Sequence, residues 1–285
     1  MRAIILCLLA CCLLAPAARS AEKWTNPILP QRADPQVFLH TDGWYYFTAT
    51  VPEYDRIELR RAKSLGELAE AKAEVVWKKH EKGPMSYHIW APELHSIGGK
   101  WYIYFAASKA EAIWDIRMYV LENEAANPLE GKWTEKGQIK MNFESFTLDA
   151  TTFEYRGKRY LAWAQSVPPK PGTSVFIAKM DSPWSISGKQ VEITAPDLPW
   201  ERIGHNVNEA PAFIHHGKQV FLTYSASATD ANYCLGMLSA ADDADLLDAK
   251  SWKKSKEPVF KSNPATSQYG PGHNCFTTSP DGKTD

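Results

Sequence analysis

The chain has 285 residues, of which 44% are hydrophobic and 12% aromatic, and its formal net charge is −1. This length and composition allow one large or two small globular domains with a sizeable core. The balanced charge offers no basic excess that would attract nucleic acid or an anionic membrane, so a neutral or small partner is favoured.

The first twenty residues differ from the rest of the chain. Arg2 gives a positive start, residues 3–16 form an apolar run, and Ala18-Arg19-Ser20 fits a small-residue cleavage site. An apolar run this short suits a secretory signal peptide better than a transmembrane helix, which needs about 20 residues. We therefore expect residues 1–20 to be a signal peptide of a secreted or periplasmic protein without a transmembrane segment. The stretch "LLAC" at residues 8–11 leaves a lipoprotein signal as an alternative.

Only two cysteines, Cys234 and Cys275, lie beyond this leader. Two cysteines in a large exported domain are not a disulfide framework, and no CxxC or His/Cys cluster suggests zinc. One bridge between them remains open.

A repeat occupies the remainder of the chain. Glycines recur 56 to 65 residues apart before strand-like residues, at Gly43, Gly99, Gly157, Gly217 and Gly282. Four short strands per unit, joined by turn residues, are typical of a propeller blade. The sequence therefore predicts an all-β catalytic domain over residues 21–285, a five-bladed β-propeller. We expect the fifth blade to be incomplete, because its unit breaks off four residues after it begins.

An ionisable residue precedes each glycine by six to nine positions. These residues are Asp34, Glu93, Asp149, Glu209 and His273. The segment before each glycine is the first strand of its blade, and first strands line the central channel. We expect Asp34, Asp149 and Glu209, at matched offsets of eight or nine residues, to converge at one end of that channel. The different offset of Glu93 favours a structural role, and a strand-end cap remains the alternative for each carboxylate taken alone.

Converging carboxylates perturb one another's pKa values, an arrangement that is tolerated mostly where chemistry needs it. Two or three carboxylates around a pocket with aromatic walls are the equipment of glycoside hydrolysis. One acid protonates the leaving oxygen and a second carboxylate acts as base or nucleophile. Placement on different blades sets the carboxylates apart, which favours an inverting mechanism.

Five motifs occur in order along nearly the whole mature chain: "ADPQVF", "WAPELH", "LDATTF", "NEAPAF" and "GPGHN". Through them the chain resembles glycoside hydrolase family 43, and the stretch that begins "RADPQVFLHTDG" is similar to its branch of exo-acting α-L-arabinofuranosidases. The resemblance implies that Asp34 is a general base and Glu209 the general acid. It also implies that Asp149 is a third carboxylate, which orients Glu209 and raises its pKa.

The resemblance assigns roles to two further residues. It implies that Trp90 helps to wall the sugar subsite, although ordinary blade packing is an alternative. His273 corresponds to a family histidine near the channel axis that is often associated with a bound ion, so a structural calcium is one expectation and a satisfied core histidine the other. The chemistry itself requires no cofactor.

Two other features can contact a sugar. The segment "VPEYDR" at residues 51–56 lies near a channel mouth, where Glu53, Tyr54 or Asp55 can reach a substrate or remain solvated. Trp114 offers either a stacking surface or one more core residue.

The function expected from these observations is an inverting α-L-arabinofuranosidase that releases terminal arabinofuranose from arabinan or arabino-oligosaccharides. A β-xylosidase or an arabinoxylan-debranching enzyme of the same family is the nearest alternative. A non-catalytic sugar-binding propeller is the alternative from another class. The partner in each case is a plant cell-wall polysaccharide or oligosaccharide.

Overall fold

The computed structural model describes residues 26–279, which form four antiparallel sheets of four strands each. The signal peptide expected at residues 1–20 and the unit expected at Gly282 lie outside the described residues. The first sheet contains β1 (Ala33–Leu39), β2 (Tyr45–Thr50), β3 (Arg56–Ala62) and β4 (Glu74–Lys78). The second contains β5 (Tyr87–Ile97), β6 (Lys100–Lys109), β7 (Ala112–Asn123) and β8 (Thr134–Gln138). The third contains β9 (Thr147–Tyr155), β10 (Lys158–Ser166), β11 (Thr173–Ser182) and β12 (Ser185–Thr194). The fourth contains β13 (Asn208–His216), β14 (Gln219–Ala226), β15 (Cys234–Ala241) and β16 (Lys253–Lys254).

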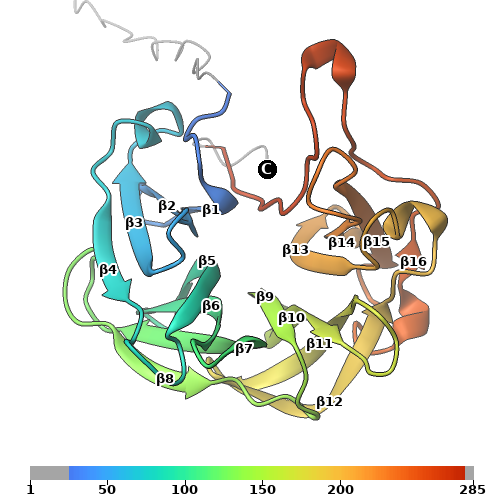
Figure 1. The fold of residues 1–285 in the computed structure, drawn as a ribbon, viewed down its shortest axis with the longest axis horizontal. Helices are drawn as coiled ribbons and strands as arrows, with labels where there is room; N and C mark the ends of the chain where they lie inside the picture. The colour runs from blue at the N-terminus through green and yellow to red at the C-terminus, as the bar shows by residue number, and fades with distance from the viewer. Residues whose placement is uncertain (1–25, 280–285) are drawn as a thin grey trace, which may run out of the picture.

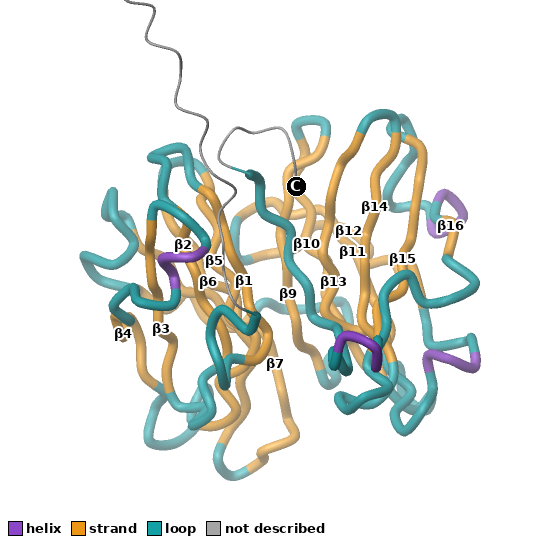
Figure 2. The backbone as a smooth tube through the Cα atoms, turned by 90° about the horizontal axis from the view of Figure 1, so that it is seen from above, coloured by secondary structure: helices purple, strands orange, loops and turns teal. Residues whose placement is uncertain are grey.

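The four sheets are arranged around a common centre (Figure 1). The first strand of each sheet, β1, β5, β9 or β13, lies innermost, and the fourth strand lies at the rim. The strands run between two ends of the molecule, where the loops gather (Figure 2). Four short 3-10 helices interrupt the loops, at Gly66–Leu68, Pro199–Glu201, Ala249–Ser251 and Pro264–Thr266. All side chains near the start of the first strands therefore share one end of the ring.

Hydrophobic side chains fill the space between neighbouring sheets. One cluster joins Ile57 of the first sheet to Phe105 of the second, and another joins Tyr104 to Trp163 of the third. A third cluster joins the third sheet to Leu222 of the fourth. Because an inner sheet is packed on both faces, its strands are apolar nearly throughout. This packing holds the four first strands in fixed relative positions.

The expectation of five blades is wrong. The units around Gly43, Gly99, Gly157 and Gly217 each form a four-stranded sheet, but residues 271–279 form no strand. A strand needs a neighbour with which to form a ladder, and these residues instead run singly between β1 and β13 (Figure 1).

Polar groups tie this C-terminal segment, residues 271–279, to both sheets. The amide of His273 donates to Ser225 Oγ at 2.7 Å, and Thr223 Oγ1 donates to Asn274 Oδ1 at 2.9 Å. On the other side, the amide of Val37 donates to Cys275 Sγ at 3.3 Å. The segment therefore joins the first sheet to the fourth without a strand ladder.

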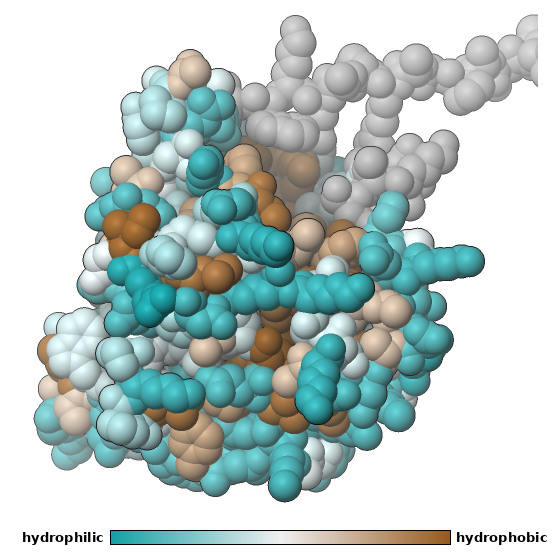
Figure 3. Space-filling view, turned by 90° about the vertical axis from the view of Figure 1, so that its right-hand side faces the viewer, coloured by the Kyte–Doolittle hydropathy of each residue, from teal (hydrophilic) through white to brown (hydrophobic). Residues whose placement is uncertain are grey.

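The surface on the side where β16 lies is mostly hydrophilic, with hydrophobic residues in small separate patches (Figure 3). Within residues 26–279, no helix has the length and apolar composition required to cross a bilayer.

Candidate active site

A repeated backbone irregularity shapes the start of the first strands. Each contains a residue with positive φ: Asp34 (53°), Ala91 (46°), Asp149 (58°) and Ala210 (49°); β5 has a second, His88 (51°). The ladder register shifts at these places, for example between Glu209 and Ala212. Such β-bulges bend a strand and redirect its side chains, and positive φ in residues with a Cβ costs about 1–3 kcal/mol. The bulges bring Asp34, Asp149 and Glu209 to the same end of the ring.

Asp34 is held in its ionised form by three donors. Its Oδ1 lies 3.0 Å from His273 Nδ1, and its Oδ2 accepts a 2.6 Å hydrogen bond from the Thr50 hydroxyl. Burial alone would raise the pKa of Asp34, but the charge and hydrogen bond of His273 and the bonds from Thr50 and the Ala91 amide hold that pKa below its ordinary value. Asp34 is therefore suited to act as a base.

Glu209 shows the opposite shift. Burial is the main cause that raises the pKa of Glu209, and the negative charge of Asp34 adds to it. Tyr233 donates a 2.8 Å hydrogen bond to Glu209 Oε1, which opposes the rise without cancelling it. Glu209 is therefore suited to hold a proton and to act as an acid.

Asp149 interacts electrostatically with both Asp34 and Glu209. Burial raises the pKa of Asp149 to about 8, against the favourable charge of His273, and the charges of Glu209 and Asp34 add to the rise. Its Oδ2 accepts a 3.0 Å hydrogen bond from the amide of Ala210, the residue that follows Glu209. Asp149 thus fixes the backbone that carries Glu209 as well as influencing its charge.

His273 supplies the positive charge of the cluster. Burial would lower the pKa of His273, but the charges of Asp34 and Asp149 raise it to about 10, so the ring is an imidazolium at neutral pH. Calcium prefers oxygen ligands, and within residues 26–279 no group of three His, Cys, Asp or Glu side chains is arranged to hold an ion. The calcium expected near His273 stays a prediction.

Trp90 lies on β5 beside the same end of the ring. Its ring stacks on His88, with centroids 4.1 Å apart, and meets Tyr54 edge-on at 5.6 Å. Trp90 Nε1 is buried and has no hydrogen-bond partner in the described part of the chain. A buried donor of this kind can bond to a ligand oxygen, so the placement suits the predicted sugar wall.

Tyr233 and Thr50 carry functional contacts that the sequence analysis missed. Neither belongs to a first-strand motif: Thr50 ends β2, and Tyr233 immediately precedes β15. Thr50 lies one strand away from a motif, and Tyr233 lies two strands away. This placement is the only feature of the sequence that could have pointed to their contacts.

A buried ion pair that was also missed anchors the start of β13. Glu201, fully buried, lies 2.7 Å from Lys254 Nζ and accepts hydrogen bonds from Asn208 Nδ2 at 3.1 Å and from the Tyr224 hydroxyl at 2.9 Å. Asn208 immediately precedes Glu209. The network therefore fixes the peptide that carries the candidate acid.

The two cysteines beyond the leader do not form a bridge. Cys234 is buried, and Cys275 accepts the hydrogen bond from Val37 described above.

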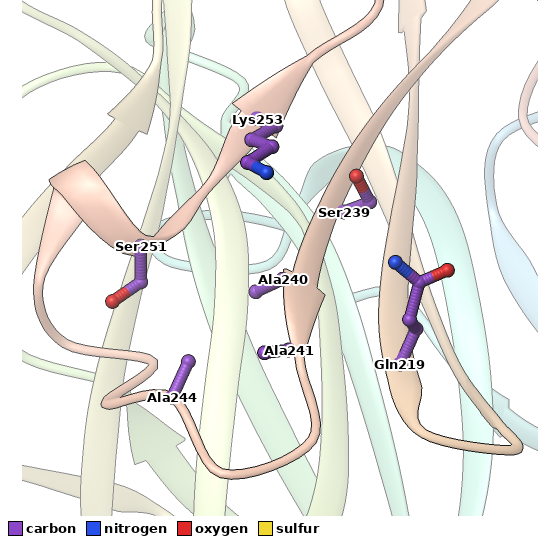
Figure 4. Close-up of a pocket in the computed structure, with 7 residues that line it drawn as sticks. All are labelled: Gln219, Ser239, Ala240, Ala241, Ala244, Ser251 and Lys253. Carbon is purple, nitrogen blue, oxygen red and sulfur yellow. The ribbon is translucent and has the colours of Figure 1, made fainter.

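A separate cavity of about 280 Å³ lies on the fourth sheet (Figure 4). Its lining comes from the end of β15, the turn after it, the 3-10 helix at Ala249–Ser251, β16 and the start of β14, at the opposite end of the sheet from Glu209. The lining residues are Gln219, Ser239, Ala240, Ala241, Ala244, Ser251 and Lys253. Without a carboxylate in that lining, this cavity lacks the acid and base of a hydrolytic site.

Comparison with known families and structures agrees with this geometry. The sequence pattern of Glycosyl hydrolases family 43 matches residues 24–285, which confirms the resemblance drawn from the motifs. A solved structure, an α-L-arabinofuranosidase from Lactobacillus brevis, is 50% identical and superposes with a TM-score of 0.88, covering 91% of this chain and 83% of that one.

Two relatives share the name extracellular exo-α-(1→5)-L-arabinofuranosidase. The protein from Streptomyces avermitilis is 63% identical over 272 residues, which are 95% of this chain and 56% of the relative. The protein from Streptomyces chartreusis is 52% identical over 273 residues, which are 95% of this chain and 83% of the relative. The chain thus spans little more than half of the first relative and most of the second.

Proposed function

Because the chain belongs to glycosyl hydrolase family 43, we propose that it removes terminal α-L-arabinofuranose units from arabinan or its oligosaccharides, with inversion at the anomeric carbon. The observation that carries the proposal is the opposite pKa shift of two carboxylates at one end of the ring: lowered for Asp34 and raised for Glu209. A glycosidase needs one carboxylate ionised and the other protonated at the same pH. The names of the similar proteins support the choice of sugar.

The reaction assigns one proton transfer to each carboxylate. Asp34 accepts a proton from a water whose oxygen forms the new bond to the anomeric carbon. Glu209 donates its proton to the glycosidic oxygen as the bond between that oxygen and the anomeric carbon breaks. Release of a proton from Asp34 and uptake of one by Glu209 then restore the starting state, so the net reaction consumes one water.

Two groups prepare this chemistry without touching the reacting atoms. The imidazolium of His273 keeps Asp34 ionised through the 3.0 Å contact. Asp149 holds the Ala210 amide and thereby the backbone of Glu209. Trp90, with its unpartnered indole N–H, lines the subsite for the sugar that is released.

We also propose that the protein is exported from the cell. The leader-like residues 1–20 and the word extracellular in the names of two relatives support export of this protein.

The test follows the anomeric configuration of the product by NMR while the protein acts on linear α-1,5-arabino-oligosaccharides. We expect arabinose of inverted configuration from the wild type and a loss of at least about 100-fold in kcat from Asp34→Asn and Glu209→Gln. Retained configuration would show that the second carboxylate is a nucleophile. Turnover of β-xylosides in preference to α-L-arabinofuranosides would contradict the assigned sugar.

A further inference from the structure

Five aromatic rings form a continuous surface beside the candidate active site. We call this surface the aromatic platform; it consists of Tyr54, Tyr87, His88, Trp90 and Trp114. His88 lies at its centre, 4.1 Å from the Trp90 ring, 4.4 Å from Tyr87 and 5.3 Å from Trp114. Trp90 also contacts Tyr54 at 5.6 Å and Trp114 at 6.3 Å. Ring contacts therefore run without interruption from the loop between β2 and β3 of the first sheet to β7 of the second.

The platform is exposed where a substrate can reach it. Trp114 is 66% exposed, Tyr54 41% and Tyr87 38%, whereas His88 beneath them is buried. Contiguous exposed aromatic side chains are unusual on a protein surface and mark binding sites. The exposed Trp114 ring is thus not one of the core residues that the sequence also allowed.

The platform is rigid. Trp114 belongs to β7. His88 Nδ1 donates a 2.9 Å hydrogen bond to the carbonyl of Ile113, the residue before Trp114. The carbonyl acceptor selects the tautomer with its proton on Nδ1, and burial lowers the pKa of His88. A preorganised surface loses little conformational entropy when a ligand binds.

A short chain of contacts connects the platform to the candidate base. Trp90 precedes Ala91, whose amide donates to Thr50 Oγ1 at 2.7 Å, and Thr50 donates to Asp34. The platform and the base therefore occupy the same end of the ring. A sugar chain with its terminal unit at Asp34 and Glu209 would have to leave the site across its rim, and the platform is an aromatic part of that rim.

From these observations we infer that the exposed rings of the aromatic platform bind the second and third arabinofuranose units of the substrate, with Trp114 as the outer stacking surface and Trp90 beside the terminal unit. The inference rests on the proposed function and adds to it a preference for chains over single sugars. The C–H faces of a furanose ring are apolar and its hydroxyls are polar, a combination that suits the amphipathic rings of Trp and Tyr.

The test measures arabinotriose and arabinose binding by isothermal titration calorimetry in an Asp34→Asn background, which prevents turnover. We expect Trp114→Ala to weaken arabinotriose binding about five- to tenfold, as the loss of one aromatic contact implies, and to weaken arabinose binding less. Trp114→Phe, which keeps an aromatic face, restores most of the difference. The matched control is Trp44→Ala, because Trp44 lies at the turn before β2, at the opposite end of the first sheet.

Three results would contradict the proposed sugar binding by the aromatic platform. The first is equal arabinotriose affinity with and without Trp114→Ala, and the second is equal weakening for arabinose and arabinotriose. The third is unchanged sugar binding with loss of self-association, which would make the patch a contact between copies of the chain. The proposed function is judged separately, by whether the wild type hydrolyses methyl α-L-arabinofuranoside, a substrate that has no second sugar unit.

Discussion

The Thr50 hydroxyl touches two parts of the site at once: it donates to Asp34 Oδ2 at 2.6 Å and accepts from the Ala91 amide at 2.7 Å. Its hydrogen bond is one of the causes that lower the pKa of Asp34. The pKa of Asp34, the proposed base, therefore depends on a residue that takes no part in the proposed reaction. In the same way, the pKa of Glu209 depends on the hydrogen bond from Tyr233.

Thr50→Val removes the donor with little change of shape. Because the bond favours the ionised carboxylate, its loss raises the pKa of Asp34, and we expect the acidic limb of the kcat/KM profile to move up by roughly one pH unit. The control is Thr48→Val, since the Thr48 hydroxyl is also buried on β2 but donates to the carbonyl of Glu58 at 3.0 Å. An acidic limb that moves equally in both variants, or in neither, would show that the Thr50 hydroxyl does not control Asp34.

Asp149→Asn tests the buried carboxylate through stability. The pKa of Asp149 is about 8 in the folded protein, above the ordinary 3.8, so folding favours the protonated form. Its contribution to stability is present at low pH and is lost as the pH rises from about 4 to about 8. We expect Asp149→Asn to become more stable relative to the wild type over that window, as measured by urea unfolding at several pH values. A relative gain that grows towards acid would have the wrong sign.

At the scale of the element, a buried ion pair holds the start of β13. The Glu201 carboxylate is fully buried and bonds to Lys254 on β16 and to Asn208 on β13. The ion pair thereby links the innermost strand of the fourth sheet to its outermost strand. Such a link keeps Glu209 in place relative to its own sheet.

Lys254→Met leaves the Glu201 carboxylate buried without its cation. Removing one partner of a buried pair costs about 3–5 kcal/mol, and we expect a loss of that size in the free energy of unfolding together with a fall in kcat. Lys253→Met changes the neighbouring, exposed lysine of β16 and should alter neither quantity measurably. Equal effects of the two substitutions would contradict the role of the network.

The register of the first strands also shows what the sequence could predict about the site. The motifs placed Asp34, Asp149 and Glu209 at the same end of the ring, and the structure brings them together. Counting from the glycine, however, put Glu209 level with the two aspartates, whereas the left-handed residue of its motif is Ala210. Glu209 thus occupies the place that Trp90 has in β5, one residue before the bulge. The bulge depends on backbone dihedrals, which the residue types in these motifs do not specify, since both Asp and Ala occupy the left-handed place.

At the scale of the whole molecule, the sequence predicted the sheets but not their number. Four glycine-centred units became four sheets, because each contains all the strands that its ladder needs. The motif around His273 has the pattern of a first strand but no neighbouring strand within residues 26–279. His273 nevertheless reaches Asp34, because that contact needs only the His273 side chain and the path of its backbone and does not need a strand.

That path depends on a close approach at Gly272. A Cβ at this position would lie 2.1 Å from two ring atoms of Tyr233. We expect Gly272→Ala to displace the C-terminal segment or Tyr233, and so to lower kcat by about tenfold or more through the contacts to Asp34 and Glu209. Gly188→Ala provides the control: its Cβ meets no atom within 4 Å, but the φ of 72° costs about 1 kcal/mol in stability. Full activity in Gly272→Ala would contradict the account of this segment.

The position of His273 has a consequence for biosynthesis. A nascent chain that has emerged as far as β16 already carries the base, the acid and the third carboxylate, but it lacks the cation that keeps the base ionised. On the proposed mechanism, catalysis begins only after the last stretch of the described chain has been synthesised and has settled between the first and fourth sheets. Proteolytic trimming before residue 273 would remove the same cation, so activity reports on the integrity of a segment that contributes no strand to any sheet.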